Sequence, residues 1–394
     1  MRIGFDATWY NGSGMGTYIA GLLAAMSEYG DEVRLFVFED PERRVPGIDD
    51  STFTRVSMRS SKFTVAEQFE FRAHCKQKPI DVFHCPYQYG VPLLLPCPLV
   101  ITVHDLIPLL FRTRNWHKQL AAMPFVKWGY RTAATRARHV IADSANTAND
   151  LQRILRVPAH RITPIHLAVS PGFFHSAVSP GESRSLAQKY GLSRPYVVVG
   201  SAGCNWRTKN VDTALESVAV ARRHAEIDFQ VAIYGPRKAL DELKNPKILS
   251  ELNVRYLGYV PVEDMGAVLR NAELFVTASL YEGFGLPILE AMSCGCPVVT
   301  SSGGSLAEVA GEGALVFEPG DAKGIARAIA HLLSNKKERE RWRERALARA
   351  AEFSWHKAAE RTIAVYRAVC DRVVVSKDLE RQRRLADARD QQSA

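Results

Sequence analysis

Short apolar runs rich in β-branched residues alternate with longer stretches of helical character along most of the chain. In the amino-terminal half, such runs predict strands at Ile3–Ala7, Val33–Phe38, Thr54–Met58, Asp81–His84, Leu99–Val103, His139–Ala142 and Ile162–Ile165. Segments between them, such as Gly16–Tyr29 and Val65–Lys76, are predicted to be helices. This alternation predicts a parallel sheet with helices on both faces.

The same alternation begins again after Pro171 and predicts a second domain. Further strands are expected at Tyr196–Ser201, Phe229–Tyr234, Val254–Leu257, Leu274–Ala278, Pro297–Ser301 and Ala314–Phe317. Between the two series the chain has the cluster of proline and glycine that is typical of a linker, within residues 169–182. We therefore predict two doubly wound α/β domains, residues 1–175 and 176–352.

The carboxyl-terminal end of the chain lacks strand-like runs. Two long charged helices are predicted there, at Ala322–Glu352 and Ser354–Ala394. We assign residues 353–394 to a separate terminal segment. Its last residues are mostly polar, which favours a frayed, solvated tail over a binding arm.

Composition and charge narrow the class of protein. Of the 394 residues, 46% are hydrophobic and 24% are charged, which is ordinary for a folded protein and excludes a mainly disordered, collagen-like or coiled-coil chain. Lys and Arg outnumber Asp and Glu by 51 to 42, so the formal net charge is +9. This surplus favours an acidic partner, which is either nucleic acid, a phosphorylated metabolite or an anionic membrane surface.

The cysteines and the apolar runs indicate whether the protein binds a metal ion and where in the cell it is expected. Seven cysteines, an odd number, do not indicate a disulfide framework, and Cys294 and Cys296 have no second pair at zinc-binding spacing. The start of the chain lacks the apolar core of a signal peptide. The most apolar run, Val91–Val103, has 13 residues, whereas a membrane span needs about 20. We therefore expect a cytoplasmic protein without a metal site.

Candidate site residues are expected at turns from strand to helix, because ligands of doubly wound sheets bind beyond the carboxyl ends of the strands. The first such turn, Asn11–Tyr18, contains alternating glycines, among them Gly14 and Gly16. These let the backbone approach an anion at a helix N-terminus, although a flexible turn has the same composition. A second turn presents His104 after an apolar strand, where a catalytic or a hydrogen-bonded structural histidine is expected.

A third turn carries two cations, Arg207 and Lys209, just before a helix. Cations at that position oppose the positive end of the helix dipole. The placement therefore suits a bound dianion, and a pair of solvated surface cations is the alternative.

The fourth turn, Glu282–Glu290, has the strongest pattern. Gly283 and Gly285 form a tight loop, and Pro287 suits the first turn of the helix that follows. Glu290 lies one turn inside that otherwise apolar helix, so both carboxylates can face one ligand. Because carboxylates accept hydrogen bonds from hydroxyls, a sugar-like polyol fits this arrangement, with a phosphate at the helix N-terminus.

Together these segments resemble the retaining glycosyltransferases of family 4. Glu-x7-Glu with an interior Gly-Phe-Gly-Leu-Pro is that family's signature, and other segments follow in the family's order: the glycine loop ending in Tyr18, Val103-His104-Asp105, Ala142-Asp143-Ser144, Val169–Phe174, Arg207–Asn210, Leu274–Thr300 and Phe353-Ser354-Trp355. The resemblance covers most of the chain. It implies the GT-B fold, in which two Rossmann-like domains face each other and a C-terminal helix returns to the first domain.

The resemblance also implies a role for each residue of the fourth turn. Glu290 would hold the ribose hydroxyls of a nucleotide, and Glu282 would lie against the donor sugar. The backbone of Phe284, Gly285 and Leu286 would line the sugar and its phosphate.

The other turns would complete the site. Arg207 and Lys209 would neutralise the diphosphate, helped by Gly14 and Gly16 from the facing domain. His104 would reach the transferred sugar. Related sequences often have an Arg directly before the Lys, where this chain has a threonine.

The implied reaction is transfer of a sugar from a nucleotide donor, with retention at the anomeric carbon by front-face attack. No Asp-x-Asp occurs in the chain, so its own cations are expected to stabilise the diphosphate without a metal ion or cofactor. The first two turns look most like bacterial mannosyltransferases of polysaccharide and O-antigen assembly, which favours GDP-mannose as donor. A UDP-sugar donor, or a nucleotide-sugar epimerase or hydrolase, is the alternative.

The acceptor is expected against the first domain, as a glycan or a polyprenyl-diphosphate-linked saccharide. Residues 105–161 contain ten Lys or Arg but three Asp or Glu, with aromatic residues among them. Such a stretch can lie on an anionic membrane, so residues 112–138 are predicted to contact the inner leaflet. The alternative is a solvated helix whose aromatics are in the core. No nucleic-acid-binding module is recognisable, so nucleic acid is not an expected partner.

Overall fold

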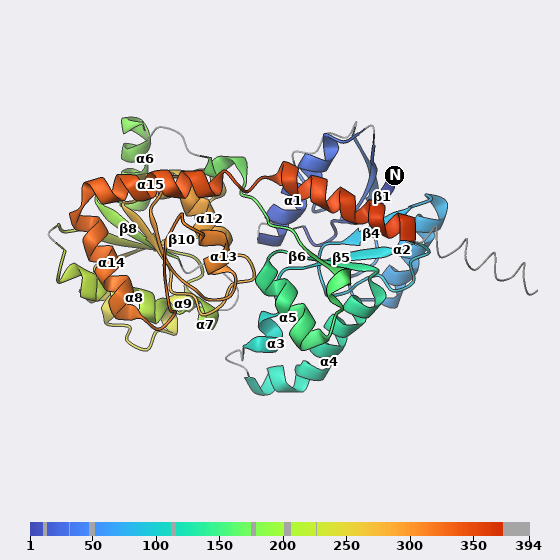
Figure 1. The fold of residues 1–394 in the computed structure, drawn as a ribbon, viewed down its shortest axis with the longest axis horizontal. Coiled ribbons are helices and arrows are strands. Elements are labelled where there is room, and N and C mark those ends of the chain that lie inside the picture. The colour runs from blue at the N-terminus through green and yellow to red at the C-terminus, as the bar shows by residue number, and fades with distance from the viewer. Residues whose placement is uncertain are drawn as a thin grey trace, which may run out of the picture.

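The computed structural model describes residues 1–10, 14–30, 32–46, 52–111, 116–174, 179–200, 206–225 and 227–372. Two parallel sheets with helices packed around them form two lobes that lie side by side (Figure 1). The first lobe contains the amino-terminal half of the chain, and the second contains most of the rest. The prediction of two doubly wound α/β domains is confirmed.

The first sheet has seven strands in the order β3-β2-β1-β4-β5-β6-β7, and every neighbouring pair is parallel. The strands are β1 (Arg2–Asp6), β2 (Arg34–Glu39), β3 (Phe53–Ser57), β4 (Val82–Cys85), β5 (Leu99–Val103), β6 (His139–Ala142) and β7 (Ile162–Pro164). The strand order reverses between β1 and β4, so the ligand-binding edge of this sheet lies at their carboxyl ends. Helices cover both faces, which explains the nearly continuous burial of β4, β5 and β6.

The second sheet has six strands in the order β10-β9-β8-β11-β12-β13, again all parallel. They are β8 (Tyr196–Gly200), β9 (Gln230–Tyr234), β10 (Val254–Gly258), β11 (Leu274–Val276), β12 (Val298–Ser301) and β13 (Leu315–Phe317). Here the order reverses between β8 and β11. The third and fourth candidate turns follow these two strands.

The helices of the first domain are α1 (Gly14–Ser27), α2 (Val65–Gln77), α3 (Ile107–Leu110), α4 (Trp116–Arg136) and α5 (Ala145–Leu155), with the short 3-10 turns Ala159–Arg161 and Pro171–Phe173. The following part of the chain forms α6 (Pro180–Tyr190), α7 (Trp206–Lys209), α8 (Val211–Arg222), α9 (Lys238–Asp241), α10 (Ile248–Glu251), α11 (Val262–Asn271), α12 (Leu286–Ser293), α13 (Leu306–Ala310), α14 (Ala322–Ser334) and α15 (Lys336–Ala350). Side chains that accept from backbone N–H groups begin several of them, such as Thr64 at α2 and Ser144 at α5.

The prediction of a single helix over residues 322–352 is wrong. The segment forms α14 and α15, which meet at Asn335. Asn335 has extended backbone, and its Oδ1 accepts a hydrogen bond of 3.1 Å from the N–H of Glu338. An asparagine in this role starts a new helix instead of continuing the old one. The next predicted helix is described over residues 355–372, and the polar tail lies outside the described residues.

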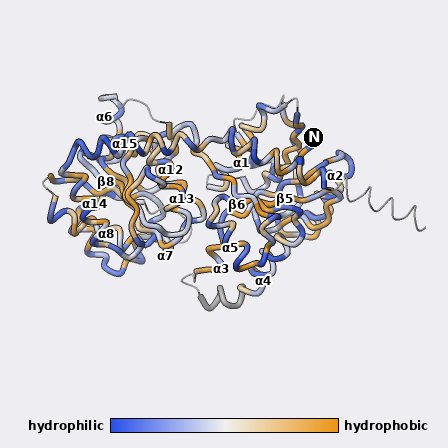
Figure 2. Tube along the Cα trace, in the orientation of Figure 1, coloured by the Kyte–Doolittle hydropathy of each residue, from blue (hydrophilic) through white to orange (hydrophobic). Residues whose placement is uncertain are grey.

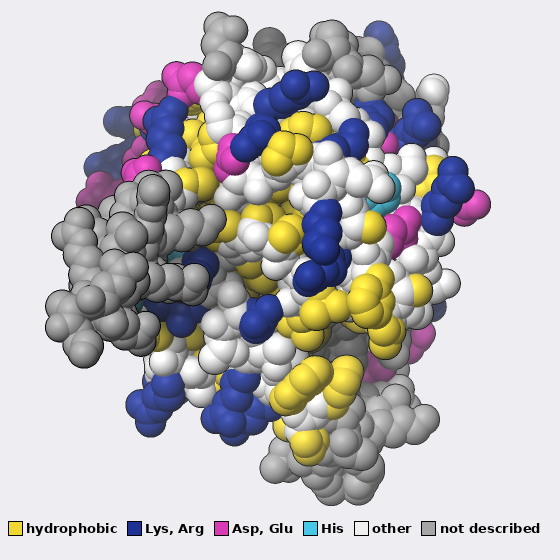
Figure 3. All heavy atoms as spheres, turned by 90° about the vertical axis from the view of Figure 1, so that its right-hand side faces the viewer, with side chains coloured by type: hydrophobic (Ala, Val, Ile, Leu, Met, Phe, Trp, Pro, Cys, Tyr) yellow, Lys and Arg dark blue, Asp and Glu magenta, His cyan; other side chains and the backbone are white. Residues whose placement is uncertain are grey.

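Hydrophobic residues concentrate along the strands and on the inner sides of the helices (Figure 2). One continuous cluster of buried side chains includes β1 and α1 of the first domain, α12 of the second and part of 355–372. The two domains therefore share apolar contacts. Seen from the end of the first domain, the surface carries many more Lys and Arg side chains than Asp and Glu (Figure 3).

The helix at 355–372 crosses from the second domain and packs along the first, beside α1 (Figure 1). Trp355 Nε1 donates to the Val169 carbonyl at 3.1 Å. Further along, Tyr366 Oη lies 2.5 Å from His84 Nδ1, and His84 Nε2 lies 2.8 Å from Thr102 Oγ1. Burial lowers the pKa of His84 to about 3, so a neutral imidazole bridges the two hydroxyls at neutral pH. These contacts fix the returning helix to the first sheet.

Tyr366→Phe should lower the free energy of unfolding by about 1–3 kcal/mol, because it leaves a buried ring nitrogen of His84 without its partner. Urea unfolding followed by circular dichroism measures this. Tyr259→Phe is the control, since Tyr259 is 79% exposed and should change stability little. Equal stability of Tyr366→Phe and wild type would contradict the assigned role.

Candidate active site

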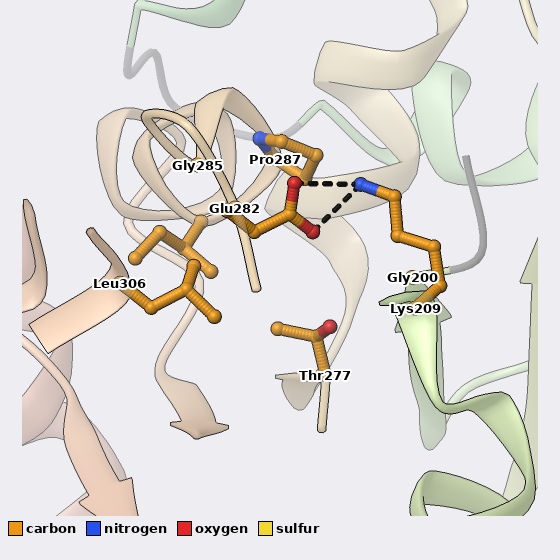
Figure 4. A pocket seen from close by; sticks show the side chains of 8 residues that line it. Gly200, Lys209, Thr277, Glu282, Gly285, Pro287 and Leu306 are labelled. Carbon is orange, nitrogen blue, oxygen red and sulfur yellow. Dashed lines mark hydrogen bonds and ion pairs between the residues drawn. The ribbon is translucent and has the colours of Figure 1, made fainter. Parts of the chain in front are cut away.

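An ion pair lies where the two central strands of the second sheet end. Lys209 Nζ donates to Glu282 Oε1 at 2.6 Å and to Oε2 at 2.9 Å, and the two side chains point toward one another (Figure 4). Ser279 Oγ also donates to Glu282 Oε1, at 2.8 Å. Both partners are mostly buried, with 11% and 13% of their side chains exposed. They line a pocket together with Gly200, Thr277, Gly285, Pro287, Ile288 and Leu306.

Backbone hydrogen bonds place Lys209 opposite Glu282. The Leu280 N–H donates to the Thr208 carbonyl at 2.6 Å. Asn210, which has a left-handed backbone conformation (φ 47°), donates from its side chain to the Ala278 carbonyl at 3.0 Å. The segment after β8 is therefore held directly against the loop after β11.

The loop from Glu282 to the start of α12 depends on three glycines and a serine. Gly285 has φ 102°, a conformation that favours glycine. A Cβ at Gly303 would lie 2.2 Å from the Ser279 carbonyl oxygen, and one at Gly304 would lie 2.4 Å from the Glu282 carbonyl oxygen. Ser305 Oγ donates to the carbonyls of Glu282 and Phe284, at 3.0 and 2.7 Å. These contacts hold the loop so that Glu282 lines the pocket.

Glu290 lies one turn inside α12, behind this loop. Among the described residues, no donor lies within hydrogen-bond distance of its carboxylate. Burial raises the pKa of Glu290 to about 7, and the ammonium of Lys209 acts against that rise. A partly buried carboxylate without a donor can accept two hydroxyl groups from a ligand.

The remaining predicted residues lie around this pocket to different extents. Arg207 is on α7 with Lys209 and has an exposed side chain. Gly14 begins α1 and faces Leu286 of the second domain, because a Cβ built on it would lie 3.4 Å from Leu286 Cδ1. Gly16 is buried inside α1. Residues 11–13 and 201–205, parts of the first and third predicted turns, lie outside the described residues.

His104 lies at the facing edge of the first sheet, with both ring nitrogens bound to protein groups. Nδ1 lies 2.6 Å from Asp143 Oδ2, and Nε2 lies 2.8 Å from the Pro86 carbonyl. Burial alone would lower the pKa of His104, but the Asp143 carboxylate and the Pro86 carbonyl raise it overall. Because both partners are acceptors, they favour the imidazolium form.

The structure brings the His104 and Glu282 segments into contact across the two domains. The Gly283 backbone packs on His104, and Ser144 Oγ donates to the Gly283 carbonyl at 2.7 Å. Sequence reasoning missed that Asp143 holds His104 and that Ser279 holds Glu282. The Ala-Asp-Ser segment before α5 was the available signal for the first, since an Asp at a strand end points to the same edge as His104.

In the described part of the chain, no group of three or more His, Cys, Asp or Glu is arranged to hold a metal ion. The cysteines within these ranges are free thiols. No helix in the described ranges is both long enough and apolar enough to cross a membrane.

Comparison with known proteins identifies the family. Residues 12–173 match the family described as Glycosyltransferase Family 4, and residues 184–349 match Glycosyl transferases group 1. The chain is 33% identical over 276 residues to O-antigen chain mannosyltransferase B of Escherichia coli, covering 68% of this chain and 70% of that relative. This chain belongs to these glycosyltransferases.

Two further similarities cover nearly the whole glycosyltransferase. It is 26% identical over 406 residues to MMP alpha-(1->4)-mannosyltransferase of Mycolicibacterium hassiacum, covering 91% of this chain and 96% of that relative. The crystal structure of Anabaena HepE in complex with UDP-glucose superposes with a TM-score of 0.72 at 18% identity, covering 93% of this chain and 100% of that one. The predicted GT-B fold is confirmed.

The pKa of Glu290 predicts how donor use depends on pH. Above pH 7 the Glu290 carboxylate is ionised and can accept hydrogen bonds from ligand hydroxyls, whereas below pH 7 it is protonated and that capacity is reduced. The donor KM of the glycosyltransferase should therefore rise about tenfold from pH 8 to pH 6, as expected for binding to the ionised form alone. Steady-state kinetics across this range measure the effect. Glu290→Gln should flatten the profile, and an unchanged slope in that variant would show that another group titrates.

Proposed function

We propose that the glycosyltransferase transfers mannose from GDP-mannose, with retention at the anomeric carbon, to a glycan or polyprenyl-diphosphate-linked saccharide in cell-surface polysaccharide synthesis. The observation that carries the proposal is the Lys209–Glu282 pair together with the buried carboxylate of Glu290, which has no hydrogen-bond donor among the described residues. A cation next to a hydroxyl-accepting carboxylate matches the diphosphate and ribose of a nucleotide sugar. Similarity to two mannosyltransferases supports the choice of sugar.

Each group has a task in the proposed reaction. Glu290 accepts hydrogen bonds from the ribose hydroxyls and so places the diphosphate near Lys209. As the bond between the anomeric carbon and phosphate oxygen breaks, Lys209 and Arg207 stabilise the negative charge on the leaving group. A donor of this kind contributes about 3–4 kcal/mol to transition-state stabilisation. Glu282 lies against the sugar, where it stabilises positive charge on the oxocarbenium-like ring.

The bond to the acceptor forms on the same face of the sugar from which the diphosphate leaves. The acceptor hydroxyl loses its proton to the departing phosphate oxygen, so the products are the glycoside and a nucleoside diphosphate. No covalent enzyme intermediate is formed in this proposal. In this proposal, the positive charge that neutralises the diphosphate comes from the protein's side chains. Neither a metal ion nor a cofactor takes part.

One observation favours a second donor. HepE, which shares the fold, has been crystallised with UDP-glucose. A UDP-sugar is therefore the alternative donor.

Donor and reaction can be tested together. GDP should raise the melting temperature of the protein more than UDP does, and GDP-mannose should support transfer to an acceptor in the presence of EDTA.

Lys209→Met should lower kcat about 100-fold or more, because it removes the cation from the leaving group. Lys189→Met is the matched control, since Lys189 pairs with Asp264 on the surface of the same domain.

Three results would count against the proposal. Greater stabilisation by UDP would support the alternative donor. Release of free sugar that no acceptor affects would indicate a hydrolase. Loss of activity in EDTA that Mg²⁺ or Mn²⁺ restores would contradict the metal-independent mechanism.

A membrane-linked acceptor is part of this proposal, and α4 supports it. Phe125 and Trp128 on α4 are 72% and 57% exposed, with ring centroids 5.9 Å apart. Lys127 and Arg131 are exposed on the same helix. Hydrophobic side chains gather low on the end face of the first domain, at the level of α4, with cations above them (Figure 3). Exposed aromatics beside cations suit an anionic phospholipid surface.

Vesicle co-sedimentation tests this contact. The protein should bind vesicles of phosphatidylglycerol and phosphatidylcholine more strongly than phosphatidylcholine alone. A double change, Phe125→Ser with Trp128→Ser, should reduce binding at least about fivefold, because it removes apolar area from the interface. Tyr259→Ser, at an exposed position of the second domain, is the control. Equal binding of the double variant and wild type would exclude this helix as the contact.

A further inference from the structure

A carboxylate of the second domain caps a helix of the first. Glu308 lies on α13, and its two oxygens accept from the N–H groups of Ala145 and Asn146, at 2.9 and 3.2 Å. These are the first two residues of α5. His166 Nε2 also lies 2.6 Å from Glu308 Oε1. Free N–H groups at a helix start are normally satisfied from nearby in the sequence, whereas here they are satisfied across the domain boundary.

Other residues of the second domain hold the same end of α5. Tyr281 Oη donates to Asp150 Oδ2 at 2.6 Å and accepts from Asn146 Nδ2 at 3.0 Å. Ser144, the N-cap of α5, donates to the Gly283 carbonyl. The first turns of α5 are therefore bound both by α13 and by the segment that carries Glu282.

This end of α5 is connected to the proposed reacting groups on both sides. Asp143, directly before the N-cap, holds the His104 ring at 2.6 Å. Gly283, which accepts from the N-cap, is next to Glu282, and Glu282 holds Lys209. Displacement of α5 would therefore move His104 relative to Lys209.

The environment of Glu308 suits a structural charge. Burial opposes its ionisation, but the hydrogen bond from His166 and those from the two backbone N–H groups lower its pKa overall. An ionised carboxylate at the positive end of the α5 dipole is stabilising there. Its oxygens are occupied by protein donors, so Glu308 has no evident task in binding substrate.

We propose that Glu308 is a positioning residue for transfer: it holds α5 against the second domain and so sets the placement of His104 relative to the donor site. The proposal rests on the proposed function, in which groups of both domains act on one sugar. Glu290 and Lys209 belong to the second domain, so the nucleotide should still bind when the Glu308 contact is lost. The step that needs both domains should be slower.

The test combines kinetics with hydrogen exchange on the full chain. Glu308→Ala should lower kcat about tenfold, which corresponds to about 1.4 kcal/mol. The Kd for GDP, or for UDP if that nucleotide binds better, should stay within about twofold of wild type, because Glu290 and Lys209 keep their places in the second domain. Amide exchange in residues 144–150 should become faster, while β8 and β11 keep their protection.

Two further variants and a control separate this role from general stability. Glu308→Gln keeps the shape but loses the charge, and Tyr281→Phe removes the neighbouring contacts of α5. Both should have intermediate effects on kcat and on exchange. Asp321→Ala removes a cap that lies wholly inside the second domain, where Asp321 Oδ1 accepts from the Gly324 N–H at 2.8 Å. It should lower thermal stability without changing kcat or exchange in α5.

The results distinguish failure of this inference from failure of the proposed function. Faster exchange of α5 with unchanged kcat would overturn the positioning role, and unchanged exchange in Glu308→Ala would overturn the contact itself. If wild type transfers sugar from neither GDP- nor UDP-linked donors, the proposed function is wrong, and the exchange data still decide whether Glu308 holds α5.

Discussion

The two domains meet as they do because residue 283 has no side chain. A Cβ on Gly283 would lie 2.2 Å from the His104 carbonyl oxygen and 2.7 Å from Asp105 Cβ, which is closer than packed atoms approach. Any other residue would separate the carboxyl end of the first sheet from the loop that carries Glu282. The backbone contact therefore sets the width of the site, and the hydrogen bonds of α5 maintain it.

Among the described residues of the site, the carboxylates of Glu282 and Glu290 are arranged around the ammonium group of Lys209. Lys209 is paired with Glu282, and the Glu290 carboxylate close by has a raised pKa because it is buried. Removing both charges of such a pair from water costs several kcal/mol, which the pair's own attraction and the Ser279 hydrogen bond offset. In the proposed reaction the diphosphate provides a second anion for Lys209, and the ribose hydroxyls provide donors for Glu290. In this proposal, Lys209 and Glu290 therefore gain ligand groups as partners when the donor binds. An apolar pocket of the same shape has no such charged groups.

Local patterns in the sequence predicted where the turns of the site lie, but they did not predict the contacts between residues far apart in the chain. The strand-to-helix turns could be located because a doubly wound sheet places every such turn at one edge, so Glu282 and Lys209 were expected near each other. The partners of His104 and α5 could not be found this way. Asp143 is 39 residues from His104, and Glu308 is 163 residues from Ala145, with no spacing that links them. The break at Asn335 was missed because the charged run favours helix throughout, and only the cap interaction of that side chain divides it.

The position of His104 limits how a histidine can assist at this site. An imidazolium next to an oxocarbenium-like sugar would repel it, since both carry positive charge. Asp143 lies 2.6 Å from the ring, so the histidine and its carboxylate together add no net charge at the sugar. Nδ1 faces Asp143 and Nε2 faces the Pro86 carbonyl, and 17% of the side chain is exposed, so neither ring nitrogen has a free lone pair. In the proposed reaction, His104 is therefore better suited to fix the orientation of the sugar than to accept a proton from the acceptor. In the proposed front-face reaction, that proton goes to the departing phosphate oxygen.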